Sequence, residues 1–224
     1  MAGTGSTWLL LEQKGAGPGA RSSHAITLVG GTAYSFGGEF TPRLPVDNTM
    51  YAFDLKAQSW SALDAAGEVP PPRVGVTMAS VGATVWVVYG FSGDAELDDV
   101  HSYDPATGEW AVVDTTGDKP TPRSVLCAAG VGKHVVVFGG EVDPSDLGHL
   151  GAGKFSAEAF VLNTDTGAWT RLDDAGSGHH PGPRGWCAFS AGALDGRRGM
   201  LVYGGNSPTN DRLGDMFLFT PLLA

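Results

Sequence analysis

Hydrophobic and polar residues alternate along this chain in short runs, and glycine or proline ends each run. Residues 51–54, 101–104 and 160–163 show the alternation most clearly, as expected for β-strands with one buried face. No stretch of useful length has helical periodicity. The 34 glycines and 14 prolines supply the turns that many short strands need. The pattern predicts an all-β protein.

The runs follow a repeating order, which begins with a proline-rich phrase ending in arginine. The phrase occurs four times, at Pro18–Arg21, Pro71–Arg73, Pro120–Arg123 and Pro181–Arg184, and successive arginines are 52, 50 and 61 residues apart. A glycine stop comes 16 residues after each of the first three arginines and 20 after the fourth. In three units a tryptophan then begins an outer strand: Trp60, Trp110 and Trp169. A period near 50 with these markers is typical of kelch-type β-propeller blades, each a four-stranded sheet.

We therefore predict one propeller domain over residues 1–224, with four blades at about 18–66, 67–116, 117–175 and 176–219. The fourth unit has no tryptophan strand of its own, whereas Trp8 precedes the first arginine as the other tryptophans precede theirs. Residues 7–12 are thus predicted to pair with the last blade and close the ring. In the alternative interpretation Trp8 is an unrelated exposed side chain. An open arc completed by dimerisation competes with the closed ring, so we expect a monomer or a homodimer.

Charge and targeting signals limit the function. The formal net charge of −10 disfavours nucleic acid or an anionic membrane as a partner. No signal peptide or membrane-spanning run is seen, which predicts a cytoplasmic protein, with the nucleus as a second compartment. Cys127 and Cys187 are expected to be buried free thiols rather than a disulfide or a metal pair.

Candidate chemistry lies in loops that should share one rim. Strands alternate in direction within a blade, so the loop at each arginine and the loop after each glycine stop open on the same face. The third of these later loops carries Glu141, Asp143, Asp146 and His149. Oxygen and imidazole donors at this spacing suit a divalent metal such as Fe²⁺. The alternative is that the acids cap turns and solvate a long loop.

The four arginines also allow two interpretations. Converging guanidinium groups could hold an anion such as sulfate by forked hydrogen bonds. Alternatively, an arginine that recurs in every blade pairs with acidic strand ends or with backbone carbonyls. Asp98, Asp99, Asp211 and Asp215 are interpreted as turn formers.

Residues 12–24, 33–39, 85–91, 182–186 and 208–212 resemble the plant specifier proteins of glucosinolate breakdown. The resemblance implies a cytosolic propeller that binds Fe²⁺ through a Glu-x-x-x-Asp-x-x-x-His motif. It also implies a small sulfated substrate, the unstable aglucone that myrosinase releases, which is diverted to nitrile-type products. Glu141 and His149 match the outer two ligands, and Arg21 or Arg184 would hold the sulfate.

Two positions depart from the family pattern. Ser145 occupies the middle ligand position, with Asp146 as a substitute beside it, and Phe91 and Ser92 stand where the family has an arginine. The sequence therefore supports two hypotheses. The first is an Fe²⁺-dependent, lyase-like specifier enzyme with Glu141, Asp146 and His149 as ligands. The second is a non-catalytic kelch module that presents its loops to a protein partner.

Overall fold

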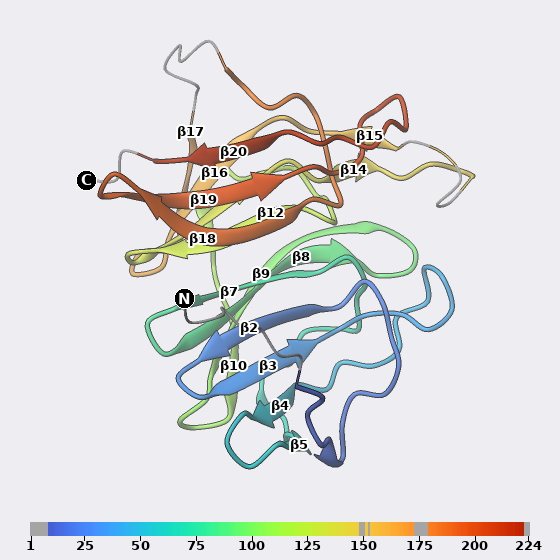
Figure 1. Ribbon diagram of the computed structural model, residues 1–224, viewed down its shortest axis with the longest axis vertical. Helices are drawn as coiled ribbons and strands as arrows, with labels where there is room; N and C mark the ends of the chain where they lie inside the picture. The colour runs from blue at the N-terminus through green and yellow to red at the C-terminus, as the bar shows by residue number, and fades with distance from the viewer. Residues whose placement is uncertain (1–8, 148–150, 152, 173–178, 222–224) are drawn as a thin grey trace, which may run out of the picture.

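The computed structural model describes residues 9–147, 151, 153–172 and 179–221. The described residues form short β-strands in four blade-like sheets arranged in a ring (Figure 1). Blades 3 and 4 occupy the upper half of Figure 1 and blades 1 and 2 the lower half. The predicted all-β fold with four blades is confirmed. The described residues contain no helix with the length and hydrophobicity needed to cross a membrane.

Each of the first three blades contains four antiparallel strands, which lie side by side in chain order. Blade 1 consists of β2 (Ala25–Val29), β3 (Thr32–Phe36), β4 (Tyr51–Asp54) and β5 (Ser59–Ala62). Blade 2 consists of β7 (Thr77–Val81), β8 (Thr84–Phe91), β9 (Glu96–Asp104) and β10 (Glu109–Val112). Blade 3 consists of β12 (Cys127–Val131), β13 (His134–Phe138), β16 (Ala159–Asn163) and β17 (Ala168–Leu172).

Blade 4 has three strands in the described part of the chain, β18 (Ala188–Leu194), β19 (Arg197–Tyr203) and β20 (Met216–Phe219). A two-stranded ribbon, β14 (Glu141–Asp143) and β15 (Lys154–Phe155), extends from blade 3 between β13 and β16.

A short parallel strand is added to the outer edge of each of the first three blades, and the sequence did not reveal it. β1 (Lys14–Gly15) pairs with β5, β6 (Ala66–Gly67) with β10, and β11 (Thr116–Gly117) with β17. The glycine of each pair has a positive φ. A Cβ atom there would lie 2.1–2.3 Å from the carbonyl oxygen of the blade's tryptophan. Only glycine allows this approach, so the segment before each of the first three arginines is fixed to the blade that follows.

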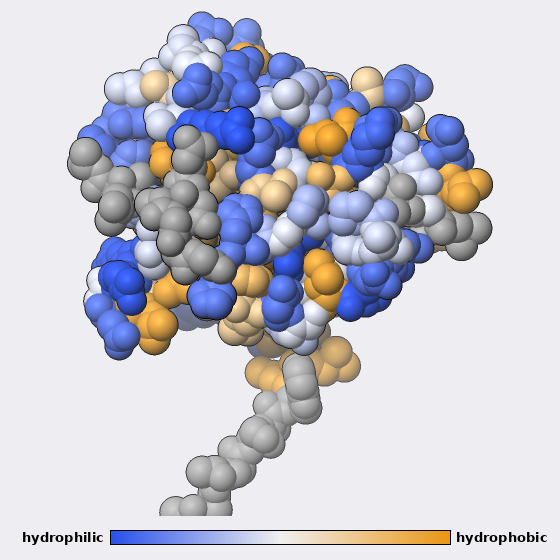
Figure 2. Space-filling model, turned by 90° about the horizontal axis from the view of Figure 1, so that it is seen from above, coloured by the Kyte–Doolittle hydropathy of each residue, from blue (hydrophilic) through white to orange (hydrophobic). Residues whose placement is uncertain are grey.

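The core consists of three apolar clusters, one at each junction between successive blades. The first joins blades 1 and 2 around Phe36 and Trp110, the second joins blades 2 and 3 around Tyr89 and Trp169, and the third joins blades 3 and 4 around Phe138. Sheets covered on both faces explain why β13 is buried along its whole length. No cluster of the described residues joins blade 4 to blade 1. The surface in Figure 2 is mainly hydrophilic, with hydrophobic residues in small separate groups.

The predicted closing strand is not shown. Trp8 lies outside the described residues. Residues 9–12 form no strand, and Leu9 and Leu10 are largely exposed. The backbone N–H of Glu12 donates a hydrogen bond of 2.9 Å to the side chain of Gln58 in blade 1. The described N-terminal segment therefore follows the outer edge of the first blade, because its Lys14–Gly15 part binds there as β6 and β11 bind in the next blades.

The two cysteines lie at the junction of blades 3 and 4. Both are free thiols, as predicted, and Cys127 is fully buried, whereas Cys187 is partly exposed. Their side chains share a hydrogen bond, which together with burial raises the pKa of the Cys127 thiol.

Candidate functional site

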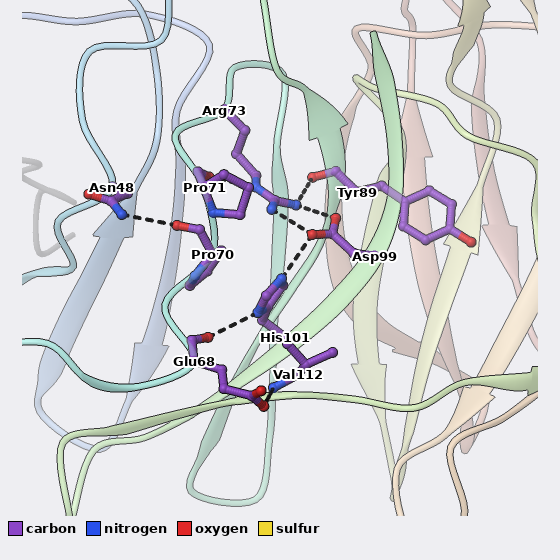
Figure 3. Close-up of polar contacts among 9 residues, drawn as sticks. All are labelled: Asn48, Glu68, Pro70, Pro71, Arg73, Tyr89, Asp99, His101 and Val112. Carbon is purple, nitrogen blue, oxygen red and sulfur yellow. Dashed lines mark hydrogen bonds and ion pairs between the residues drawn. The ribbon is translucent and has the colours of Figure 1, made fainter.

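The arginine that begins each blade is an internal crosslink of that blade. In blade 2 the Arg73 guanidinium donates to both carboxylate oxygens of Asp99, at 2.6 and 2.8 Å, and to the carbonyl of Tyr89 at 3.1 Å (Figure 3). The Arg73 side chain is completely buried. His101 holds the same carboxylate at 2.8 Å. Burial alone would raise the pKa of Asp99, but these hydrogen bonds hold it well below its usual range.

The other three arginines repeat this arrangement. Each pairs with an acidic residue further along its own blade and donates to the carbonyl of the residue at its own glycine stop. The acidic partners are Asp47 for Arg21, Glu158 for Arg123 and Asp215 for Arg184. In blades 1, 3 and 4 the arginine also lies over an aromatic ring of its own blade.

These contacts correspond to the second interpretation of the arginines, in which they pair with acids and carbonyls. Arg21 and Arg184 are nearly completely buried at the side chain. The suggestion that they hold sulfate stays a prediction. Asp99 and Asp215 were interpreted as turn formers, and this was wrong for their main role, because both are the carboxylate partners of buried arginines.

The arginine backbone joins one blade to the preceding one. The carbonyls of Arg73, Arg123 and Arg184 accept hydrogen bonds of 2.9–3.1 Å from the N–H groups of Gly38, Gly90 and Gly140, the second stop residues of the blades before them. The first stop residue is equally constrained. A Cβ atom on Gly139 would lie 2.5 Å from the Arg184 carbonyl oxygen, and φ is 71° there. The glycine stop is therefore required by the neighbouring blade as well as by the turn.

The second residue after each arginine turns the chain into the centre of the ring. Ser23, Gly75, Val125 and Trp186 all have a positive φ, between 47° and 59°. They are linked across the blades, because the N–H of each later residue donates to the carbonyl of the one before it, at 2.8–3.2 Å. A β-branched residue rarely adopts this conformation, so Val125 is held there by the two backbone bonds.

These four residues surround a cavity of about 510 Å³, which we call the rim hollow. All four blades contribute to it. Its chemistry comes from carboxyl groups, cations, an amide and aromatic rings: Glu39, Glu96, Glu141, Arg43, Arg212, Asn206, Phe91, Phe155, Trp186 and Tyr203. A cavity of this size suits a small organic ligand.

The carboxyl groups of the rim hollow carry less negative charge than their number suggests. Burial, together with the nearby Glu141 and Asp143, raises the pKa of Glu96 to about 8, although a hydrogen bond from the Ser124 hydroxyl opposes the rise. One carboxyl oxygen of Glu96 is buried without a hydrogen-bond partner. Burial also raises the pKa of Glu141. At neutral pH Glu96 is therefore mostly protonated and can donate a hydrogen bond.

Arg43 and Glu96 are residues of the rim hollow that the sequence reasoning missed, and Arg43 is its cation from blade 1. It follows the glycine stop of blade 1, and its guanidinium reaches across to donate 2.9 Å to the carbonyl of Ser145 in the blade 3 loop. It also lies near the face of Phe91, 5.9 Å from the ring centroid. The loop after each glycine stop was expected on this rim. Because Arg43 lies in the first such loop, its sequence position could have identified it as a rim residue.

The structure brings one of the three predicted metal ligands into the rim hollow. Glu141 lines it and packs against Gly153. Asp146 lies in a separate recess with Ser145 and Lys154, and His149 lies outside the described residues. Within residues 9–147, 151, 153–172 and 179–221 no three His, Cys, Asp or Glu side chains come together as metal ligands.

The side chains that follow Glu141 in the motif form contacts with other residues. Asp143 forms an exposed ion pair with Lys154. The Ser145 hydroxyl accepts a hydrogen bond from the backbone N–H of Leu147. Among the described residues these donors therefore do not form a set that fits Fe²⁺.

Comparison with known proteins identifies the repeat. The family model of the KLHDC2/KLHL20/DRC7 Kelch-repeats domain matches residues 4–140 of this sequence. N-(sulfonatooxy)prop-2-enimidothioate sulfolyase of Thlaspi arvense is 36% identical over 93% of this chain and 64% of its own length. Kelch domain-containing protein 3 of Bos taurus is 30% identical over 92% of this chain and 53% of its own length.

Other relatives match a smaller part. The Rab9 effector protein with kelch motifs of Bos taurus is 35% identical over 42% of this chain and 26% of its own length. The chain thus spans less than two thirds of the length of these relatives. With four blades joined by the same arginine and glycine contacts, the chain belongs to the kelch-repeat family.

Proposed function

We propose that this protein is a specifier-like kelch protein of glucosinolate breakdown, acting in the cytoplasm. It would bind the sulfated aglucone released by myrosinase in the rim hollow and divert it to nitrile-type products. The observation that carries the proposal is the position of Glu141, which the resemblance names as a functional residue and which lines a cavity shared by all four blades. The similarity to a plant sulfolyase over 93% of the chain supports the same assignment.

The charges of the rim hollow support an anionic substrate. Negative charge develops on the sulfate as the nitrogen–oxygen bond breaks and the sulfate leaves with the bonding electron pair. For a nitrile product the carbon–sulfur bond breaks as well, so that its electron pair becomes the third carbon–nitrogen bond and the sulfur atom is released. Arg43 provides a cation in the hollow, and protonated Glu96 provides a neutral hydrogen-bond donor. Both groups would stabilise the leaving sulfate without rearrangement. This assigns to Arg43 the role that the sequence suggested for Arg21 or Arg184.

Iron would act as a Lewis acid on the substrate sulfur when bound. The described residues do not form a complete ligand set. Glu141 and His149 remain the proposed ligands, with Asp146 as the third.

The test is a myrosinase-coupled product assay with and without Fe²⁺, in which nitrile and isothiocyanate are measured by gas chromatography. We expect the protein to raise the nitrile fraction. Arg43→Gln should lower that effect about 10- to 100-fold, because a hydrogen bond to a charged group contributes about 1.5–3 kcal/mol. Glu141→Gln should lower it similarly, whereas Lys133→Ala, which removes an exposed ion pair with Asp165, should not. A product ratio equal to that of myrosinase alone would contradict the proposal.

The second candidate function is a non-catalytic kelch module that presents its rim loops to a protein partner. Ser145 at the middle ligand position favours it, because a neutral hydroxyl is a poor iron ligand. Iron binding separates the two candidates. One Fe²⁺ per chain, lost in His149→Ala, supports the enzyme. An intact fold that binds no iron at micromolar concentration supports the module.

A further inference from the structure

Blades 1 and 4 are the first and last of the four blades, and each exposes a sheet face whose equivalent is buried in the other three blades. The blade 4 end face consists of the side chains of Leu194, Leu201, Tyr203, Met216 and Leu218, which all point away from blade 3. The blade 1 end face consists of Ile26, Leu28 and Trp60, which all point away from blade 2. On the end-face side of the innermost strand β18, Ala188, Ser190 and Leu194 are exposed, whereas β7 and β12 are mostly buried.

Repeat-equivalent positions show how unusual the blade 4 end face is. Tyr203 precedes the glycine stop and is 49% exposed, whereas the equivalent residues of blades 1, 2 and 3 are at most 3% exposed: Phe36, Val88 and Phe138. Met216 pairs with Tyr203 and is 65% exposed, whereas its equivalents are at most 5% exposed: Met50, Val100 and Ala159. In blades 1 to 3 these positions are covered by the next blade.

The blade 1 end face shows the complementary half of the same joint. Ile26 is 59% exposed, whereas its equivalents in blades 2 and 3, Met78 and Ala128, are each 3% exposed. Trp60 is only partly buried, whereas Trp110 and Trp169 are fully buried. At the first junction Trp110 packs on Phe36 of the preceding blade, with ring centroids 5.3 Å apart.

We propose that a second copy of this chain covers both end faces, so that two four-blade arcs close one ring of eight blades. Blade 4 of each copy packs on blade 1 of the other. Tyr203 then takes the place of Phe36 and Trp60 the place of Trp110. The N–H of Gly205 donates to the carbonyl of Arg21, as Gly38 donates to Arg73 within the chain.

A second copy is the occupant because the chain carries both halves of the joint. A face that fits blade 1 and a face that fits blade 4 complement each other by the same contacts that hold the three internal junctions. Such head-to-tail contacts form a closed ring when the rotation closes. Two copies give eight blades, which is within the usual range of four to eight, whereas three copies would give twelve.

The test measures the mass in solution by sedimentation velocity from 1 to 100 µM. We expect a species of about twice 23.1 kDa. Met216→Asp and Ile26→Asp should each give a monomer, because each places a charge in both joints. Both residues are exposed in the single chain, so folding should be retained, as checked by circular dichroism. Leu55→Asp, at an exposed turn of blade 1, is the control that should leave the dimer unchanged.

Mixing the two variants tests the geometry itself. A mixed dimer has one joint with both substitutions and one joint with none. The 1:1 mixture should therefore regain at least part of the dimer that each variant alone has lost. A monomeric wild-type protein at 100 µM, a dimer that persists in both variants, no recovery on mixing, or growth into larger polymers would each overturn the proposal.

Discussion

The buried Arg73–Asp99 pair allows a sharp prediction about the stability of the blades. Replacing Arg73 by leucine removes two hydrogen bonds to Asp99 and one to the Tyr89 carbonyl. The lost attraction matters less than the charge left behind. After the substitution, Asp99 is a partly dehydrated carboxylate with His101 as its remaining side-chain partner in Figure 3.

The loss of stability depends on which member of the Arg73–Asp99 pair remains in the protein. Removing one member of a buried pair costs about 3–5 kcal/mol. The Asp99 side chain is 32% exposed, so water can partly solvate it, and we expect about 3 kcal/mol for Arg73→Leu. Asp99→Leu leaves a guanidinium with 0% exposure, so we expect about 5 kcal/mol. The double variant should cost less than the sum of the two, because neither charge remains.

Thermal unfolding checks this order. At about 2–4 °C per kcal/mol for a chain of this size, Arg73→Leu should lower Tm by roughly 6–12 °C. Lys133→Leu is the matched control, because its ion pair with Asp165 is more than half exposed on both sides and should contribute less than about 1 kcal/mol. Losses below about 1 kcal/mol for both single variants, or a larger loss for Arg73→Leu than for Asp99→Leu, would refute the reasoning.

Two further predictions concern the rim hollow and the glycine stops. Because the folded pKa of Glu96, about 8, lies above its usual value of 4.5, the folded state binds more protons between these values, and stability should fall as pH rises from about 4.5 to about 8. Glu96→Gln should remove that fall in stability, which is at most about 5 kcal/mol. The measurement is Tm as a function of pH for both proteins. Parallel Tm curves for the wild type and the variant would contradict the raised pKa of Glu96. Gly139→Ala should cost at least about 2 kcal/mol, because φ is positive and the new Cβ would meet the Arg184 carbonyl. Gly182→Ala, with open space around it, should change stability by less than about 0.5 kcal/mol, and equal effects at the two glycines would argue against the proposed role of the stop.

Local pattern was enough to predict the blades. Strand alternation, the glycine stops and the recurring tryptophans depend on neighbours within a few residues, and the four sheets confirm the interpretation. The arginine partners were harder, because Asp47 and Asp99 lie 26 residues beyond their arginines. That equal spacing in the first two units was present in the sequence. It was hidden in the later units, where the partners Glu158 and Asp215 are 35 and 31 residues away.

The rim hollow could not be predicted as a set, because its members come from loops of different blades. Glu96 begins a strand of blade 2, Glu141 begins the blade 3 ribbon, and Arg43 lies in a loop of blade 1. Nothing in their sequence spacing joins them. The raised pKa of Glu96 has the same origin, because it comes first from burial and then partly from Glu141, 45 positions away.

The same repeat explains both the strength of the internal junctions and the exposure of the two ends. Every blade carries an arginine carbonyl for the blade before it and a glycine N–H for the blade after it, so the first and last blades each keep one half of a joint. The rim hollow depends on those end blades, since Arg43 of blade 1 reaches the blade 3 loop and Tyr203 of blade 4 lines the wall. Binding in the hollow and pairing of two chains should therefore be linked, because Tyr203 belongs both to the wall of the hollow and to the proposed joint with the second copy.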